Sequence, residues 1–231
     1  MTIPVELARD LEALYVQFEP YRPRGLLEHS PLKSPTIAAA LKSKPLRDLS
    51  ADDFKGYSGS AVWTVGTAND FKYFFPRMAE LALHEIVGAS GWDSWAFRLV
   101  PALATANEAS AVSSFFRTLW ETALASYQEV VHVDTLELLH ALTYVFADIR
   151  EFLLVFEPCI NRAAALHLRD ICADGPRQGV AESETPLQIA TWFQGTAHRV
   201  LADSVSRFPP LDTDEVGWCD VAFQNLGARA R

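Results

Sequence analysis

The stretch that decides the fold runs from residue 134 to residue 156 and reads DTLELLHALTYVFADIREFLLVF. Its apolar side chains recur at helical spacing over a wide arc, which is typical of a helix buried on more than one side. Asp134 stands just before the first apolar residue, where a carboxylate can accept hydrogen bonds from the free N–H groups of a helix start. We therefore predict one long central helix over residues 134–156.

Helical spacing of apolar residues also recurs on both sides of this stretch. No segment shows the sustained period-two alternation of a strand, and no repeat of helical pairs stands out. Helix starts and stops predict an all-α fold, an irregular array or bundle of about eight to ten helices with stacked helical pairs as one option. We expect residues 1–231 to form a single helical domain. The other predicted helices cover residues 4–18, 36–41, 50–65, 69–87, 92–106, 108–127, 158–173, 186–208 and 213–226.

Composition places the chain among ordinary globular proteins. It has 231 residues, of which 49% are hydrophobic and 21% charged, with a net charge of −9. No cluster of Lys and Arg is present, which argues against nucleic acid as a partner, whereas a basic protein would be compatible. The three cysteines are far apart, which is typical of reduced thiols. With no apolar signal core and no bilayer-spanning run, we expect a cytoplasmic protein without membrane contact.

One segment of the sequence is the best candidate for a functional site. Residues 49–77 read LSADDFKGYSGSAVWTVGTANDFKYFFPR. Ser50 and Asp53 predict a helix start, Gly66 a helix end, and Asn69 or Asp70 the start of the next helix. Pro76 lies inside that second helix, where proline removes a hydrogen bond, so either the helix kinks there or it begins near residue 75.

Polar side chains gather along this segment. At helical spacing Glu80 can pair with both Arg77 and His84. The segment predicts a ligand-binding or partner-binding surface, and Trp92 and Trp95 could line a groove beside Trp63. The alternative is a solvated helix face in which Asp70 serves the helix dipole and Pro76 shapes a bend. The candidate binding residues are Trp63, Asp70, Lys72, Tyr73, Arg77, Glu80 and His84.

The same segment resembles a family of uncharacterised bacterial, all-helical proteins. Their shared pattern is Trp-Gly, then Asp-Phe-Lys/Arg-x-Phe-x-Pro-Arg, matched here by residues 70–77 behind Trp63 and Gly66. Two departures are visible: Tyr73 stands where such relatives often have His, and Thr64-Val65 separates Trp63 from Gly66. The resemblance implies a helical fold and a bacterial source, and it implies no activity.

Motifs for catalysis or metal binding are incomplete. Two Glu-x-x-His pairs occur, Glu129 with His132 and Glu137 with His140, but di-iron bundles draw such pairs from separate helices with further Glu donors. The chain has no HExxH, GxSxG or phosphate-binding glycine loop. We therefore predict no catalytic residues, no metal and no cofactor.

These observations favour a non-enzymatic protein-binding module over an enzyme. Two alternatives stay open. One is an enzyme or small-molecule binder with a polar pocket near Trp63, Asp70 and Arg77. The other is a scaffold that acts by self-association, so the predicted partner is either another protein or a second copy of this chain.

Overall fold

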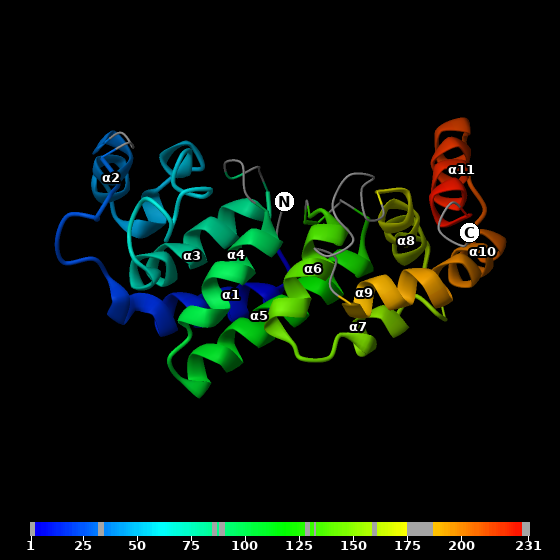
Figure 1. The fold of residues 1–231 in the computed structure, drawn as a ribbon, viewed down its shortest axis with the longest axis horizontal. Coiled ribbons are helices and arrows are strands. Elements are labelled where there is room, and N and C mark those ends of the chain that lie inside the picture. The colour runs from blue at the N-terminus through cyan, green and yellow to red at the C-terminus, as the bar shows by residue number, and fades with distance from the viewer. Residues whose placement is uncertain are drawn as a thin grey trace.

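The protein is an array of packed helices (Figure 1). A computed structural model describes residues 3–31, 35–84, 87, 91–127, 130–131, 133–158, 161–174 and 187–227. Within these residues, β pairing is confined to two isolated bridges, from Val65 to His29 and to Ala61. The predicted all-α fold is therefore confirmed.

The helices follow one another with short connections. A π-helical turn, Phe193–Ala197, joins α9 to α10 without a break, so the described residues form ten separate helices. Most boundaries lie within a few residues of the predicted ones, although α3 ends at Ala82 instead of near residue 87, and α8 begins at Arg162 instead of Pro158. The helices are α1 Val5–Phe18, α2 Pro35–Lys42, α3 Ala68–Ala82, α4 Trp92–Leu99, α5 Ala106–Ala125, α6 Thr135–Val145, α7 Arg150–Leu154, α8 Arg162–Asp174, α9 Leu187–Trp192, α10 His198–Arg207 and α11 Thr213–Gly227.

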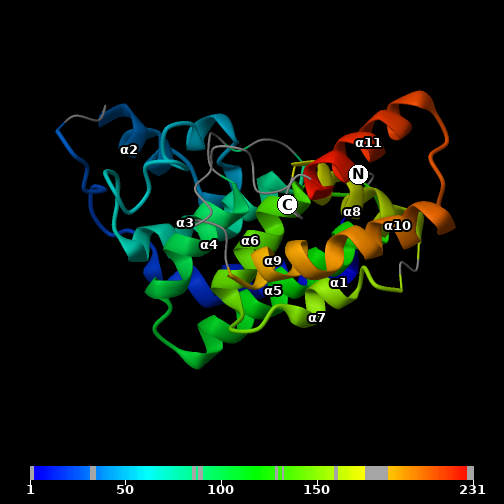
Figure 2. The same cartoon turned by 45° about the vertical axis from the view of Figure 1, so that its right-hand side comes forward.

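The array is elongated, with α2 at one end and α10 and α11 at the other (Figures 1 and 2). Helix α1 packs along α5 and α3, α4 packs on α6, and α8 packs on α11. One hydrophobic cluster extends from Leu7 in α1 to Leu226 in α11. Among the described residues, no helix is both long enough and apolar enough to cross a bilayer.

The predicted central helix is two helices. Asp134 caps α6 as expected, accepting from the N–H groups of the second and third residues after it at 2.9 and 3.0 Å. The chain then turns extended at Phe146, and α7 begins at residue 150. Gln188 of α9 fills the gap: its amide oxygen accepts from the N–H of Ile149 and its amide nitrogen donates to the carbonyl of Ala147, both at 2.8 Å. A side chain distant in sequence thus replaces helical hydrogen bonds.

The predicted helix over residues 50–65 is wrong. Only a 3₁₀ turn, Asp52–Phe54, forms there, followed by turns with positive φ at Gly56 (78°) and Val62 (70°). The carboxylate of Asp53 does bond to Ser50, accepting from its backbone N–H and its hydroxyl at 2.8 Å. The start signal was therefore real, but residues that leave the right-handed region end the helix within one turn.

Helix α3 starts at Ala68, one residue earlier than predicted, and continues through Pro76. Thr67 is the N-cap: its hydroxyl accepts from the N–H of Asp70 at 3.2 Å, and the Asp70 carboxylate accepts from the N–H of Thr67 at 2.7 Å. This reciprocal pair is a capping box. Because the helix continues unbroken from Ala68 to Ala82, the alternative start near residue 75 is wrong, and Pro76 is buried inside it.

Candidate functional site

The seven residues predicted from the sequence do not surround one cavity. Asp70 is occupied in the capping box of α3, and Tyr73 is buried with its ring edge-on to Phe74 at 5.1 Å. His84 is exposed just beyond the end of α3. The other four divide among a buried ion pair, a polar contact with α1 and an exposed aromatic cluster.

Lys72 belongs to the buried ion pair. Its Nζ lies 3.3 Å from Oε2 of Glu108, and the two side chains are only 1% and 2% exposed. The ammonium also lies 3.5 Å from the centroid of the Tyr21 ring, and Tyr21 donates its hydroxyl proton to Oε1 of Glu108. The N–H of Ala104 donates to Oε2 at 2.7 Å. Both charges are compensated inside the fold, which is typical of a structural pair.

Arg77 and Glu80 join α3 to its neighbours. Glu80 accepts at 2.6 Å from Arg77, as predicted, and at 2.6 Å from the hydroxyl of Tyr15 in α1. Arg77 also donates its Nε–H to the carbonyl of Leu49 at 2.7 Å. In the described part of the chain Glu80 does not pair with His84. Burial, and then the hydrogen bond and charge of Glu80, raise the pKa of Tyr15, so its hydroxyl stays a donor.

Trp63 belongs to a row of three exposed aromatic residues that lie far apart in sequence. Its ring stacks on Phe97 of α4, with centroids 6.4 Å apart and planes at 20°. Phe97 in turn meets Tyr144 of α6 edge-on, at 5.5 Å. The exposed fractions of Trp63, Phe97 and Tyr144 are 67%, 47% and 42%. These three side chains, called the aromatic surface below, form a continuous patch in solvent, whereas Trp92 and Trp95 are buried in the hydrophobic core.

Backbone contacts hold the Trp63 turn in place. Arg98 of α4 is buried and donates from Nη1 to the carbonyl of Ala61 at 3.2 Å, while its Nε–H bonds to the carbonyl of Ser94 at 2.9 Å. On the other side of the turn, the N–H of Ser30 donates to the carbonyl of Thr64 at 2.8 Å. Trp63 is therefore presented by a fixed turn anchored both to α4 and to residues 28–30.

A carboxylate adjoins the aromatic surface. Burial raises the pKa of Tyr144, and the negative charge of Asp93 in the first turn of α4 raises it further. The same burial effect lowers the pKa of His140, against the opposing charge of Asp93. Near neutral pH the Tyr144 hydroxyl is therefore protonated and His140 is mainly neutral.

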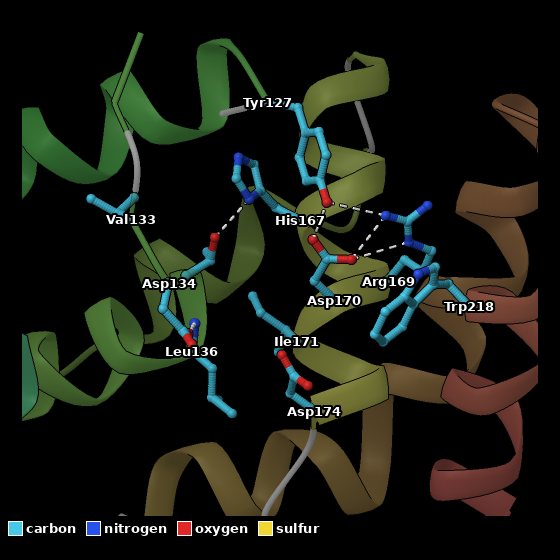
Figure 3. Close-up of a pocket in the computed structure, with 11 residues that line it drawn as sticks. Tyr127, Val133, Asp134, Leu136, His167, Arg169, Asp170, Ile171, Asp174 and Trp218 are labelled. Carbon is cyan, nitrogen blue, oxygen red and sulfur yellow. Dashed lines mark hydrogen bonds and ion pairs between the residues drawn. The ribbon is translucent and has the colours of Figure 1, made fainter. Parts of the chain in front are cut away.

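A pocket of about 420 Å³ opens at the other end of the array, between α6, α8 and α11 (Figure 3). Its wall combines aliphatic, aromatic and ionisable side chains. We call it the α8 pocket. It is lined by Tyr127, Val133, Asp134, Thr135, Leu136, His167, Arg169, Asp170, Ile171, Asp174 and Trp218.

One wall of the α8 pocket is a closed polar network (Figure 3). The hydroxyl of Tyr127 donates to Oδ2 of Asp170 at 2.5 Å, and Arg169 donates to Oδ1 of the same carboxylate at 2.9 and 3.1 Å. The guanidinium also donates to the Tyr127 oxygen at 3.2 Å. Burial and then the hydrogen bond to Asp170 raise the pKa of Tyr127 to about 12, so this hydroxyl keeps its proton.

His167 also lines the α8 pocket, and each of its ring nitrogens forms a hydrogen bond. Nε2 lies 2.8 Å from the carbonyl oxygen of Ala123 and therefore carries the proton, while Nδ1 lies 2.6 Å from the hydroxyl of Thr135. Burial lowers the pKa of His167 against the raising effect of its carbonyl partners. We infer a neutral imidazole that accepts from Thr135, an arrangement suited to holding α8 against α5 and α6.

Metal binding finds no support in the described residues. No group of three His, Cys, Asp or Glu side chains there is placed to hold an ion. Glu137 instead lies against the start of α4, and Glu129 and His132 fall outside the described residues. The α8 pocket went unpredicted because its lining comes from four separate stretches, and no spacing signal links residues 127, 135, 167 and 218.

The search for similar proteins returned none: no family model, no curated protein and no solved structure matches this chain.

Proposed function

We propose that this protein is a non-enzymatic protein-binding module and that the aromatic surface is its partner contact. The observation that carries the proposal is the exposed Phe97 ring, which contacts exposed Trp63 on one side and exposed Tyr144 on the other. Large aromatic side chains contribute most of the binding energy at many interfaces, and contiguous exposed apolar patches mark such sites.

The fixed position of Trp63 supports the proposal. A side chain on a turn anchored through Ala61 and Thr64 loses little conformational freedom when a partner covers it. Interfaces gain affinity when the groups that make contact are held in place before binding.

Charge favours a basic partner. Asp93 lies one helical turn before Phe97 in α4, on the same face of that helix, and the whole chain carries a net charge of −9. A partner that presents Arg or Lys beside aliphatic side chains could place its cation over the faces of Trp63 and Tyr144. The proposed partner is therefore a protein with a basic and apolar contact surface.

Affinity capture from a lysate of the source cells tests the proposal. The double variant Trp63→Ala/Phe97→Ala removes two of the three rings, and Leu211→Ala, an exposed apolar side chain at the other end of the array, is the control. We expect the wild type and the control to retain a protein that the double variant loses. Equal capture by all three proteins would refute the aromatic surface as the contact.

One further variant and one further measurement separate the alternatives. Arg77→Ala tests the wider set predicted from the sequence, and capture should survive this change because Arg77 contacts Glu80 and Leu49 away from the aromatic rings. Light scattering tests self-association. A dimer that the double variant Trp63→Ala/Phe97→Ala dissociates would replace the proposed partner with a second copy of this chain.

A further inference from the structure

The α8 pocket has the size and construction of a small-molecule site. Its volume, about 420 Å³, lies in the range of pockets that enclose small ligands. Three of its polar residues are more than nine-tenths buried: Thr135, His167 and Arg169. Their side chains are held by the hydrogen bonds described above, so the wall exists before any ligand arrives. This site is distinct from the aromatic surface and independent of the function proposed for it.

The lining has an excess of negative charge. Among the described lining residues, three are aspartates, Asp134, Asp170 and Asp174, and one is a cation, Arg169. That guanidinium is paired with Asp170 at 2.9 Å, so it offers no free charge to an anion. His167 adds no positive charge at neutral pH, because burial lowers its pKa. An anionic ligand would therefore be repelled, and a cationic one attracted.

Aromatic side chains complete a site for an organic cation. The Trp218 ring comes from α11 and lies beside Arg169 and Asp170, and Tyr127 contacts the same two residues through its hydroxyl (Figure 3). Leu136 and Ile171 supply aliphatic contact. A ligand with an ammonium group and an apolar body could place its charge toward the carboxylates and its body against these side chains.

We propose that the α8 pocket binds a small organic cation, an amine with an apolar or aromatic body. A metal ion fits the described residues less well, because no three acidic or histidine side chains converge there. The aspartates are instead spread around the pocket, from the cap of α6 to the last residue of α8. Such a spread suits a charge carried on an extended organic molecule.

Three ligands of similar shape but different charge test whether the pocket prefers a cation. Isothermal calorimetry on the full chain compares 2-phenylethylamine with 2-phenylethanol and 3-phenylpropionate, and calcium chloride serves as the bare-cation probe. We expect saturable binding of the amine, at least about tenfold weaker binding of the neutral alcohol, and no binding of the carboxylate. Calcium should not compete with the amine.

Variants link that binding to the pocket. Asp134→Asn keeps a good helix cap, because asparagine caps as well as aspartate, and Asp174→Asn changes an exposed residue at the end of α8. The double variant should weaken amine binding by about tenfold or more and weaken alcohol binding little. Asp52→Asn is the matched control, since Asp52 is exposed and belongs to the 3₁₀ turn in the N-terminal half of the chain.

Four results would overturn the proposal. They are no binding of the amine, equal binding of amine and alcohol, preference for the carboxylate, and equal loss of binding in Asp52→Asn and the double variant. Circular dichroism of each variant separates loss of the site from loss of the fold. None of these results bears on capture of a protein by the aromatic surface, so the two proposals fail separately.

Discussion

The buried ion pair between Lys72 and Glu108 permits a sharp prediction about stability. Both side chains are at most 2% exposed, so replacing one partner leaves the other charge in a dry environment. Removing one partner of a buried pair costs about 3–5 kcal/mol. Glu108→Gln also replaces one accepting oxygen with a donor facing Tyr21, Ala104 or Lys72. We therefore expect Glu108→Gln and Lys72→Met each to lower the free energy of unfolding by about 3–5 kcal/mol.

The double variant Lys72→Met/Glu108→Gln decides whether coupling causes that loss. With both charges gone, no uncompensated charge remains, so the double variant should lose less than the sum of the single variants by about 2 kcal/mol or more. Urea denaturation followed by circular dichroism measures all four proteins. Losses that simply add would show that the two residues contribute separately and would refute the buried pair as a coupled unit.

Acid provides a second test of the same pair. Burial alone raises the pKa of Glu108, but hydrogen bonds from Tyr21 and Ala104, together with the charge of Lys72, outweigh burial and lower it. Because the pKa is lower in the folded state, the stabilisation is complete above the unfolded value of about 4.3 and is lost as pH falls through the folded value. The deficit of Glu108→Gln should therefore shrink at acidic pH, and a deficit that grew there would contradict this assignment.

Three further variants test how the helices are joined, each by urea denaturation. Gln188→Ala should cost about 1–3 kcal/mol, because it leaves the N–H of Ile149 unpaired in the break between α6 and α7, and a loss near zero would show that water replaces it. Gly91→Ala should displace the Glu137 carboxylate, whose Oε2 would lie 1.9 Å from the new Cβ, at little cost because this is the far end of a flexible side chain; a large loss of stability would show that the carboxylate is held in place. Thr67→Ala should cost about 1 kcal/mol through the capping box of α3, and wild-type stability would argue against that cap.

Local signals in the sequence predicted most helices correctly. Asp134 was recognised as a cap because its position before an apolar run has a local meaning. The break after Val145 was missed because the hydrogen bonds that stabilise it come from Gln188, more than forty residues along the chain. Long-range contacts of this kind leave no periodicity in the sequence that they interrupt.

The turn after Phe54 shows a second limit of predicting structure from local sequence. Gly56 weakened the predicted helix but did not exclude it, and Val62 gave no warning, because a valine with positive φ is rare. That conformation depends on anchors outside the turn, at Arg98 and at residues 28–30. Tertiary contacts thus override the local preference of this segment.

The candidate surfaces were predicted only in part. Trp63 stood out in the sequence, but its neighbours Phe97 and Tyr144 lie 34 and 81 residues further along the chain and carry no shared motif. The position of Tyr144 fits the polar face of a helix, so nothing in the sequence indicates an aromatic contact. Helix packing alone brings the three side chains together.

The aromatic surface as a partner contact is the central claim, and the affinity of the captured partner tests it most directly. Calorimetry should compare the wild type, Trp63→Ala/Phe97→Ala and Leu211→Ala with that purified partner. Two hot-spot aromatics of about 2 kcal/mol each predict a loss of affinity on the order of a thousandfold for the double variant and none for Leu211→Ala. An unchanged affinity in a folded double variant would contradict the claim.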